Sequence, residues 1–224
     1  MESEGTLARD RSRPRAYSMA MMFVLLLSAF NLRPGVTSIG PVLSEISESL
    51  SLTSAAAGVL AAIPVLTFGI FAFATPTLVS WFGLHRLAFL AITITGIGLA
   101  ARPWVDELVP FFLLTAVGLS GLATLNVILP SLVRRHFANS IGLATALYTT
   151  ALGVGLTAGA LLTYPIAARV GVDGWRFGLT VWGLTALVGV PVWLLVVIRQ
   201  PRSQAADSPR GRIRLREIAK TRLG

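Results

Sequence analysis

The sequence contains no cysteine and only two histidines, His85 and His136. Without cysteine the chain can form no disulfide and can supply neither a thiolate metal ligand nor a thiol nucleophile. Two histidines are too few for a metal site built from imidazoles. We therefore expect no metal and no other cofactor.

Charge is also scarce: 13% of the 224 residues are charged, whereas 54% are hydrophobic. A soluble domain normally has about 25% charged residues. A membrane-spanning helix needs about 20 mostly apolar residues, and no segment shows the alternation typical of barrel strands. The sequence predicts an all-α polytopic membrane protein with a six-helix transmembrane bundle over residues 17–198. The six apolar segments lie at about 17–43, 55–78, 85–103, 107–132, 139–168 and 175–198.

Acidic residues are few, 10 against 19 basic ones, which gives a net charge of +9. The basic residues lie between and beyond the apolar segments, so they indicate membrane topology and not a nucleic-acid partner. Fifteen lie on the side of the N-terminal tail: four in the tail itself, three in two loops and eight after residue 198. Three lie on the other side, and Arg33 lies inside the first segment. Because cytoplasmic loops are enriched in Lys and Arg, we expect both termini on the cytoplasmic side of an inner membrane.

The stretches outside the bundle are predicted to be cytoplasmic. Residues 1–16 form a basic tail, and residues 199–224 form a basic linker followed by an amphipathic segment. Such a segment either lies on the anionic surface of the lipid bilayer or remains a solvated tail.

Charge and proline interrupt the first apolar segment at Arg33, Pro34 and Pro41. An ionisable residue inside a membrane is costly and by default marks a functional path. Each proline removes a helix hydrogen bond, and the freed carbonyls are tolerated where they face protein or a water-lined cavity. We predict a cavity wall in which Arg33 attracts the negative end of a small solute. The alternative is a buried cation held by freed carbonyls such as that of Phe30.

Three more residues are candidates for the same substrate-binding cavity. Asn31 lies about 200° from Arg33 on an ideal helix, so the two share one cavity only if the turn at Pro34 is distorted. Asn126 either lines the cavity or helps to satisfy a kink at Pro130, four residues later. Tyr148 either reaches the cavity or packs between helices.

The fifth apolar segment carries two stripes of small residues at four-residue spacing. The first stripe has no obvious use within six helices and predicts a helix-packing surface, because small residues let backbones approach closely in a membrane. Lining a substrate path is the alternative. The first stripe is Ala151, Gly155 and Gly159, and the second is Thr145, Thr149, Gly153 and Thr157.

Four motifs make residues 17–198 resemble the major facilitator superfamily, and most closely its cyanate and 2-nitroimidazole porter branch. They are Asn31-Leu-Arg-Pro-Gly, Asn126-Val-Ile-Leu-Pro, Gly142-Leu-Ala-Thr-Ala-Leu-Tyr-Thr-Thr-Ala151 and Gly174-Trp-Arg176. The resemblance implies two three-helix inverted repeats that form the N-terminal half of a twelve-span carrier. It also implies secondary active transport of a small anionic or polar solute by alternating access, without enzymatic activity. The fifth helix would then contact a second six-helix half, or a homo-oligomer partner, so we expect the Ala151 stripe to be exposed.

One loop departs from the pattern of that superfamily. Between the second and third helices, Pro76 stands at the usual Gly position and Ser80 at the usual Asp position, and only Gly83 matches. The conformational latch that the resemblance attributes to the Asp is therefore in doubt. The predicted spans also carry no acid away from their ends, so no carboxylate proton relay is visible.

The sequence is also compatible with one other function and disfavours a third. The chain could be a membrane fragment or subunit that does not transport without a second half, because alternating access needs two bundles. An intramembrane serine protease is disfavoured. Gly118-Leu-Ser120-Gly121 resembles the rhomboid motif, but the histidine base that this chemistry needs is absent from the sixth segment.

Overall fold

The computed structural model describes residues 15–198, and all regular structure in that range is helical. Six helical stretches are long and apolar enough to cross a membrane, which confirms the predicted class and number of spans. The predicted tails, residues 1–16 and 199–224, lie outside the described residues apart from 15 and 16. The elements are α1 Arg15–Asn31, α2 Pro34–Thr37, η1 Gly40–Val42, α3 Leu43–Ser49, α4 Ser54–Phe82, α5 Leu84–Ala101, η2 Arg102–Trp104, α6 Leu108–His136, η3 Ala138–Ser140, α7 Ile141–Val170 and α8 Gly174–Ile198.

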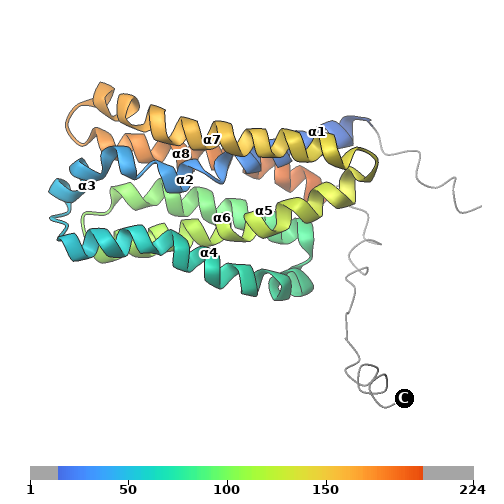
Figure 1. Ribbon diagram of the computed structural model, residues 1–224, viewed down its shortest axis with the longest axis horizontal. Coiled ribbons are helices and arrows are strands. Elements are labelled where there is room, and N and C mark those ends of the chain that lie inside the picture. The colour runs from blue at the N-terminus through green and yellow to red at the C-terminus, as the bar shows by residue number, and fades with distance from the viewer. Residues whose placement is uncertain (1–14, 199–224) are drawn as a thin grey trace, which may run out of the picture.

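The first three spans and the last three make equivalent contacts: spans 1, 2 and 3 correspond to spans 4, 5 and 6. The helix α4 packs on α6 as α7 packs on α1, and α5 packs on α6 as α8 packs on α1. The pair α5 and α8 maps onto itself and forms an extensive contact. Figure 1 shows α7 and α4 at opposite edges of the bundle, and α1 begins at the end where α8 stops. This arrangement is that of two three-helix inverted repeats.

The first span is a broken helix, as its prolines predict. The helix α1 ends at Asn31, and the single turn α2 begins at Pro34. The turn is closed by the backbone amides of Val36 and Thr37, which both donate to the carbonyl oxygen of Arg33 at 3.0 Å. By contrast, α4, α6, α7 and α8 pass through their prolines as continuous helices.

The predicted loop after the first span is too long. The apolar segments 17–43 and 55–78 leave residues 44–54 as the predicted connection, but α3 occupies Leu43–Ser49. Pro41 lies in η1, where its missing amide interrupts the helix without ending the span. The chain then turns through residues 50–53, and the Thr53 hydroxyl accepts a hydrogen bond from the Ala56 amide at 3.2 Å to cap α4.

The inner face of α7 packs against the broken span. A Cβ atom at Gly155 would overlap the carbonyl oxygen of Phe30, and one at Gly159 would lie 2.7 Å from the Cα of Pro34. Gly155 and Gly159 are buried and Ala151 is half-buried. The expectation that this stripe would be exposed in the six-helix unit is therefore wrong. The reason is local: the break at Pro34 leaves the backbone of Phe30 and Pro34 close against α7, and only glycine leaves room for it.

The Gly174-Trp-Arg176 motif ties two loops together at one end of the bundle. Gly174 lies so close to the carbonyl oxygen of Ala167 that a side chain would overlap it. Arg176 donates to the carbonyl oxygen of Pro103 at 2.5 Å and forms an ion pair with Asp106 at 2.8 Å. The motif thus joins the start of α8 to the loop between α5 and α6.

Candidate functional site

Arg33 lies at the break of the first span, close to its centre. The span runs over Ser18–Ser49, so Arg33 is 15 residues from one end and 16 from the other. The residue is exposed, and within residues 15–198 its guanidinium forms no hydrogen bond or ion pair. The alternative of a buried cation held by the Phe30 carbonyl does not describe this arrangement, because that oxygen lies against Gly155.

Asn31 points the other way, into the bundle. It is 2% exposed, and its Nδ2 donates to the carbonyl oxygens of Leu27 at 2.8 Å and Thr185 at 3.4 Å. The Thr185 hydroxyl donates back to Asn31 Oδ1 at 2.7 Å. Asn31 therefore fastens α1 to α8, and the structure does not bring it onto the face that carries Arg33.

Asn126 and Tyr148 lie on the two helices that flank the break. The helices α6 and α7 both contact α1 and α2. Asn126 is exposed on α6, and among the described residues its side chain has no hydrogen-bond partner, so it does not satisfy a kink at Pro130. Tyr148 is half-buried and packs against the apolar core.

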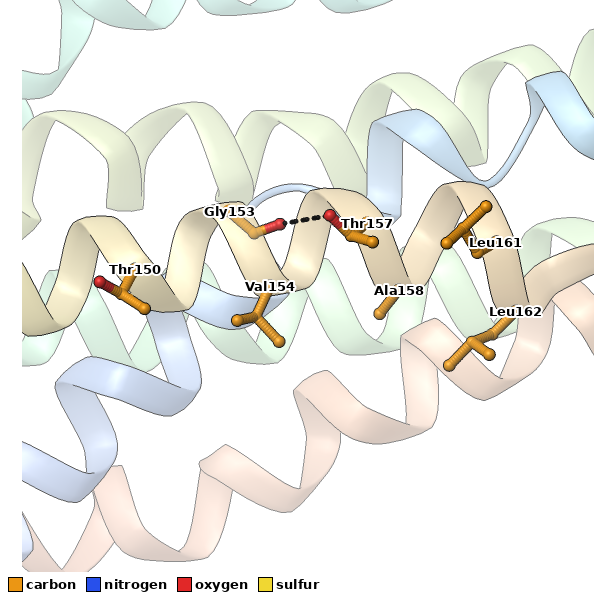
Figure 2. A pocket seen from close by; sticks show the side chains of 7 residues that line it. All are labelled: Thr150, Gly153, Val154, Thr157, Ala158, Leu161 and Leu162. Carbon is orange, nitrogen blue, oxygen red and sulfur yellow. Dashed lines mark hydrogen bonds between the residues drawn. The ribbon is translucent and has the colours of Figure 1, made fainter.

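The outer face of α7 carries the second stripe. Thr149, Gly153 and Thr157 are exposed, and a Cβ atom at Gly153 would meet no atom within 4 Å. The Thr157 hydroxyl donates to the carbonyl oxygen of Gly153 at 3.1 Å, as Figure 2 shows. A shallow hollow of about 590 Å³ runs along this face between Thr150 and Leu162. We refer below to the exposed Arg33, Asn126, Thr149, Gly153 and Thr157 as the open face, a set that is defined by exposure alone.

The sequence pattern did not predict the role of Arg102, one of the three basic residues on the side opposite the N-terminal tail. Arg102 is fully buried, and its guanidinium donates to the Gly35 carbonyl oxygen at 3.4 Å and to the Ser38 hydroxyl at 3.3 Å. Arg102 lies within the apolar segment 85–103, before Pro103 and Trp104. Long basic side chains near the end of a span usually reach the interface, so this position did not indicate burial.

The groups needed for a serine protease are not together. The Ser120 hydroxyl donates to the carbonyl oxygen of Val117 at 2.7 Å. The Nε2 atoms of His85 and His136 lie 2.7 Å from each other, at the ends of α5 and α6. In the part of the chain that the structure describes, no three His, Asp or Glu residues are placed to hold a metal ion.

A family model described as Major Facilitator Superfamily matches residues 10–223. The chain belongs to the major facilitator superfamily. This confirms the resemblance and explains the paired three-helix repeats, because six helices make half of the facilitator fold.

Three curated relatives of this facilitator chain are transporters by name. One is an uncharacterized transporter of Bacillus subtilis, YycB, which is 33% identical over 170 residues, or 76% of this chain and 42% of the relative. The 2-nitroimidazole transporter of Escherichia coli is 30% identical over 172 residues, 76% of this chain and 42% of the relative. The cyanate transport protein CynX of Escherichia coli is 27% identical over 183 residues, 82% of this chain and 47% of the relative. The facilitator chain thus spans less than half the length of these relatives.

Proposed function

We propose that the chain is the N-terminal half of a secondary active transporter that moves a small anionic or polar solute across the cytoplasmic membrane. The observation that carries the proposal is Arg33, an exposed cation near the centre of a membrane span with no hydrogen bond or ion pair among the described residues. A charge at this depth is costly, so its retention favours a role in binding.

The chemistry of a guanidinium suits a flat or linear anion. Its planar fork offers parallel N–H donors, whereas lysine offers a point charge. Two relatives are named for cyanate, which is a linear anion, and for 2-nitroimidazole, whose nitro group presents two oxygens in one plane. Either solute could accept hydrogen bonds from Arg33, with Asn126 and Tyr148 on the flanking helices as further polar contacts. The proposal includes no enzymatic step and no cofactor.

Alternating access needs a second bundle that moves against the first. The chain spans 42 to 47% of the length of the three relatives. In the six-helix unit alone, Arg33 and Asn126 are exposed. We propose that a second six-helix unit covers the open face and completes the cavity. A membrane subunit that binds a second half without transporting a solute is the alternative.

The excess of basic residues on one side supports an orientation with both termini in the cytoplasm. The chain has no cysteine, so single cysteines can report on each side. A cysteine at Glu48, exposed on α3, should react with an impermeant thiol reagent added to intact cells. One at Asn139, exposed in η3, should react only after the membrane is opened. The reverse pattern would show that the topology is inverted.

Uptake by the complete carrier, meaning this chain together with a second six-helix half, tests the function. Cyanate and 2-nitroimidazole serve as the two probes. Arg33→Ala should abolish cyanate uptake and Arg33→Lys should weaken it, while membrane abundance stays near the wild-type level. Arg169→Ala is the control, since Arg169 is exposed at the end of α7. Full uptake in the Arg33→Ala variant would reject the role of Arg33. Binding of a second half without uptake of either probe would favour the non-transporting subunit.

A further inference from the structure

Arg102 is a buried cation that no carboxylate neutralises within the described residues. It is the first residue of η2, directly after α5, and it is 0% exposed. Its Nη1 and Nη2 atoms donate to the Gly35 carbonyl oxygen and the Ser38 hydroxyl, whereas the buried Nε atom has no hydrogen-bond partner among residues 15–198. The ion pairs found between residues 15 and 198 are those of Arg176.

A buried, unneutralised guanidinium is energetically unfavourable compared with an apolar side chain. Burial removes the charge from water, and an apolar side chain of similar volume often packs at least as well. What the guanidinium adds is a pair of donors directed at one segment of the first span. In the described part of the chain no backbone amide donates to the carbonyl oxygen of Gly35, because its α-helical donor would be the amide of Ile39, which lies beyond the end of α2. Arg102 therefore supplies a donor that the broken helix lacks.

The segment that Arg102 holds is the one that orients Arg33. Arg33 is the N-cap of α2, and its carbonyl oxygen closes the turn to Val36 and Thr37. On one side of this turn, Pro34 packs against Gly159 of α7, and the Thr37 hydroxyl has two acceptors within reach, the carbonyl oxygens of Arg33 at 3.1 Å and of Leu156 on α7 at 3.4 Å. On the other side Gly35 and Ser38 accept from Arg102. The turn is thus held between α7 and Arg102, and Arg33 projects from it.

The position of Arg102 is itself fixed from the neighbouring loops. The next residue, Pro103, accepts the 2.5 Å hydrogen bond from Arg176, which also pairs with Asp106 at 2.8 Å and lies 3.6 Å from Asp173. The hydrogen bonds of Arg176 and of Arg102 therefore start from adjacent residues of η2, one set reaching the loops at the start of α6 and α8 and the other the turn that carries Arg33.

We propose that Arg102 is a positioning residue that fixes the turn at Gly35–Ser38 and thereby sets the direction of the Arg33 guanidinium. The consequence for transport rests on the proposed function of Arg33. The consequence for structure does not, and each is measured separately.

Spin labels test the structural part. One label replaces Gly40, where a Cβ atom meets nothing within 4 Å, and the other replaces Ser80, exposed near the end of α4. In the complete carrier, the distance distribution should be narrow for wild type and for the control Arg169→Met. It should be broad for Arg102→Met and intermediate for Arg102→Lys, which retains donors. An unchanged distribution in Arg102→Met would overturn the proposal.

A second variant keeps the test decisive if Arg102→Met does not accumulate in the membrane. Ser38→Ala removes one acceptor of Arg102 without adding volume, so it should also broaden the distribution. A wild-type distribution in Ser38→Ala, combined with loss of both Arg102 variants, would make Arg102 a residue of general stability and would overturn the proposal.

Uptake kinetics test the transport part, with cyanate as the probe. Misplacement of a binding group should raise KM for Arg102→Met by about tenfold, with Vmax and membrane abundance near wild type. Arg102→Lys should recover part of that loss. A broad label distribution with unchanged KM would show that the turn is held by Arg102 but does not set binding, and would overturn the assignment. If the wild-type carrier takes up no probe, the proposed function fails, while the label distances still decide whether Arg102 holds the turn.

Discussion

Asn31 and Arg33 are two residues apart, yet their surroundings are opposite. Asn31 is 2% exposed and exchanges hydrogen bonds with Thr185 on α8. Arg33 is exposed, and its guanidinium is without a hydrogen bond or ion pair in the described range. The two look equally anomalous in an apolar segment. A polar side chain that forms its hydrogen bonds inside the bundle is explained by its role in packing. A polar side chain at the same depth that forms no such bonds is a candidate for solute binding.

The two faces of α7 repeat the comparison with glycines. Gly155 faces the Phe30 carbonyl on the inner side, and Gly153, two residues earlier, faces open space. Both belong to stripes with the same four-residue spacing. The spacing predicts a surface that allows close approach, but which of the two stripes meets the bundle depends on the rotation of the helix.

Among the substitutions that test the difference between the two faces of α7, the largest loss of stability is expected at Gly155. Gly155→Leu should destabilise the bundle by about 3 kcal/mol or more, because the new side chain must displace the backbone of α1. Gly153→Leu, the matched control, should change the stability of the six-helix unit by less than about 0.5 kcal/mol. Thermal unfolding of the purified variants in detergent measures both. Equal stability of the two variants would show that the assigned rotation of α7 is wrong.

A smaller difference is expected between the two asparagines. Asn31→Leu should cost about 1 kcal/mol, because Thr185 loses its partner across the α1–α8 contact. Asn126→Leu should leave stability within about 0.5 kcal/mol of wild type, because that side chain makes no hydrogen bond among the described residues. The same unfolding measurement applies. A larger loss at Asn126 than at Asn31 would reverse their assignments to the open face and the bundle.

Gly153→Leu should have the smallest effect on the stability of the bundle. Its effect on association with a second six-helix half distinguishes the outer face of α7 from the inner face. The substitution leaves the six-helix unit intact but adds bulk to the open face, so it should reduce co-purification with the second half. Thr145→Val, on the same stripe but half-buried, is the control. Normal co-purification of the Gly153→Leu variant would place the partner elsewhere on the unit.

The sequence predicts the spans well, because apolar length and proline act locally. The break at Pro34 and the opposed directions of Asn31 and Arg33 follow from helix geometry alone. The partner of Gly155 could not be predicted in this way, because it depends on where the Phe30 carbonyl lies after the break. Arg102 was missed for a similar reason: its acceptors, Gly35 and Ser38, are more than 60 residues away in the chain.

The central claim is that the unpaired cation at the break binds the solute. Equilibrium binding of the anionic probe to the purified complete carrier tests it most directly, with wild type, Arg33→Lys and Arg33→Gln compared at equal amounts of folded protein. The affinity should fall in that order, by about tenfold or more for the neutral glutamine, and Asn31→Leu should bind the probe as wild type does. Equal affinity in the wild type and Arg33→Gln would contradict the account.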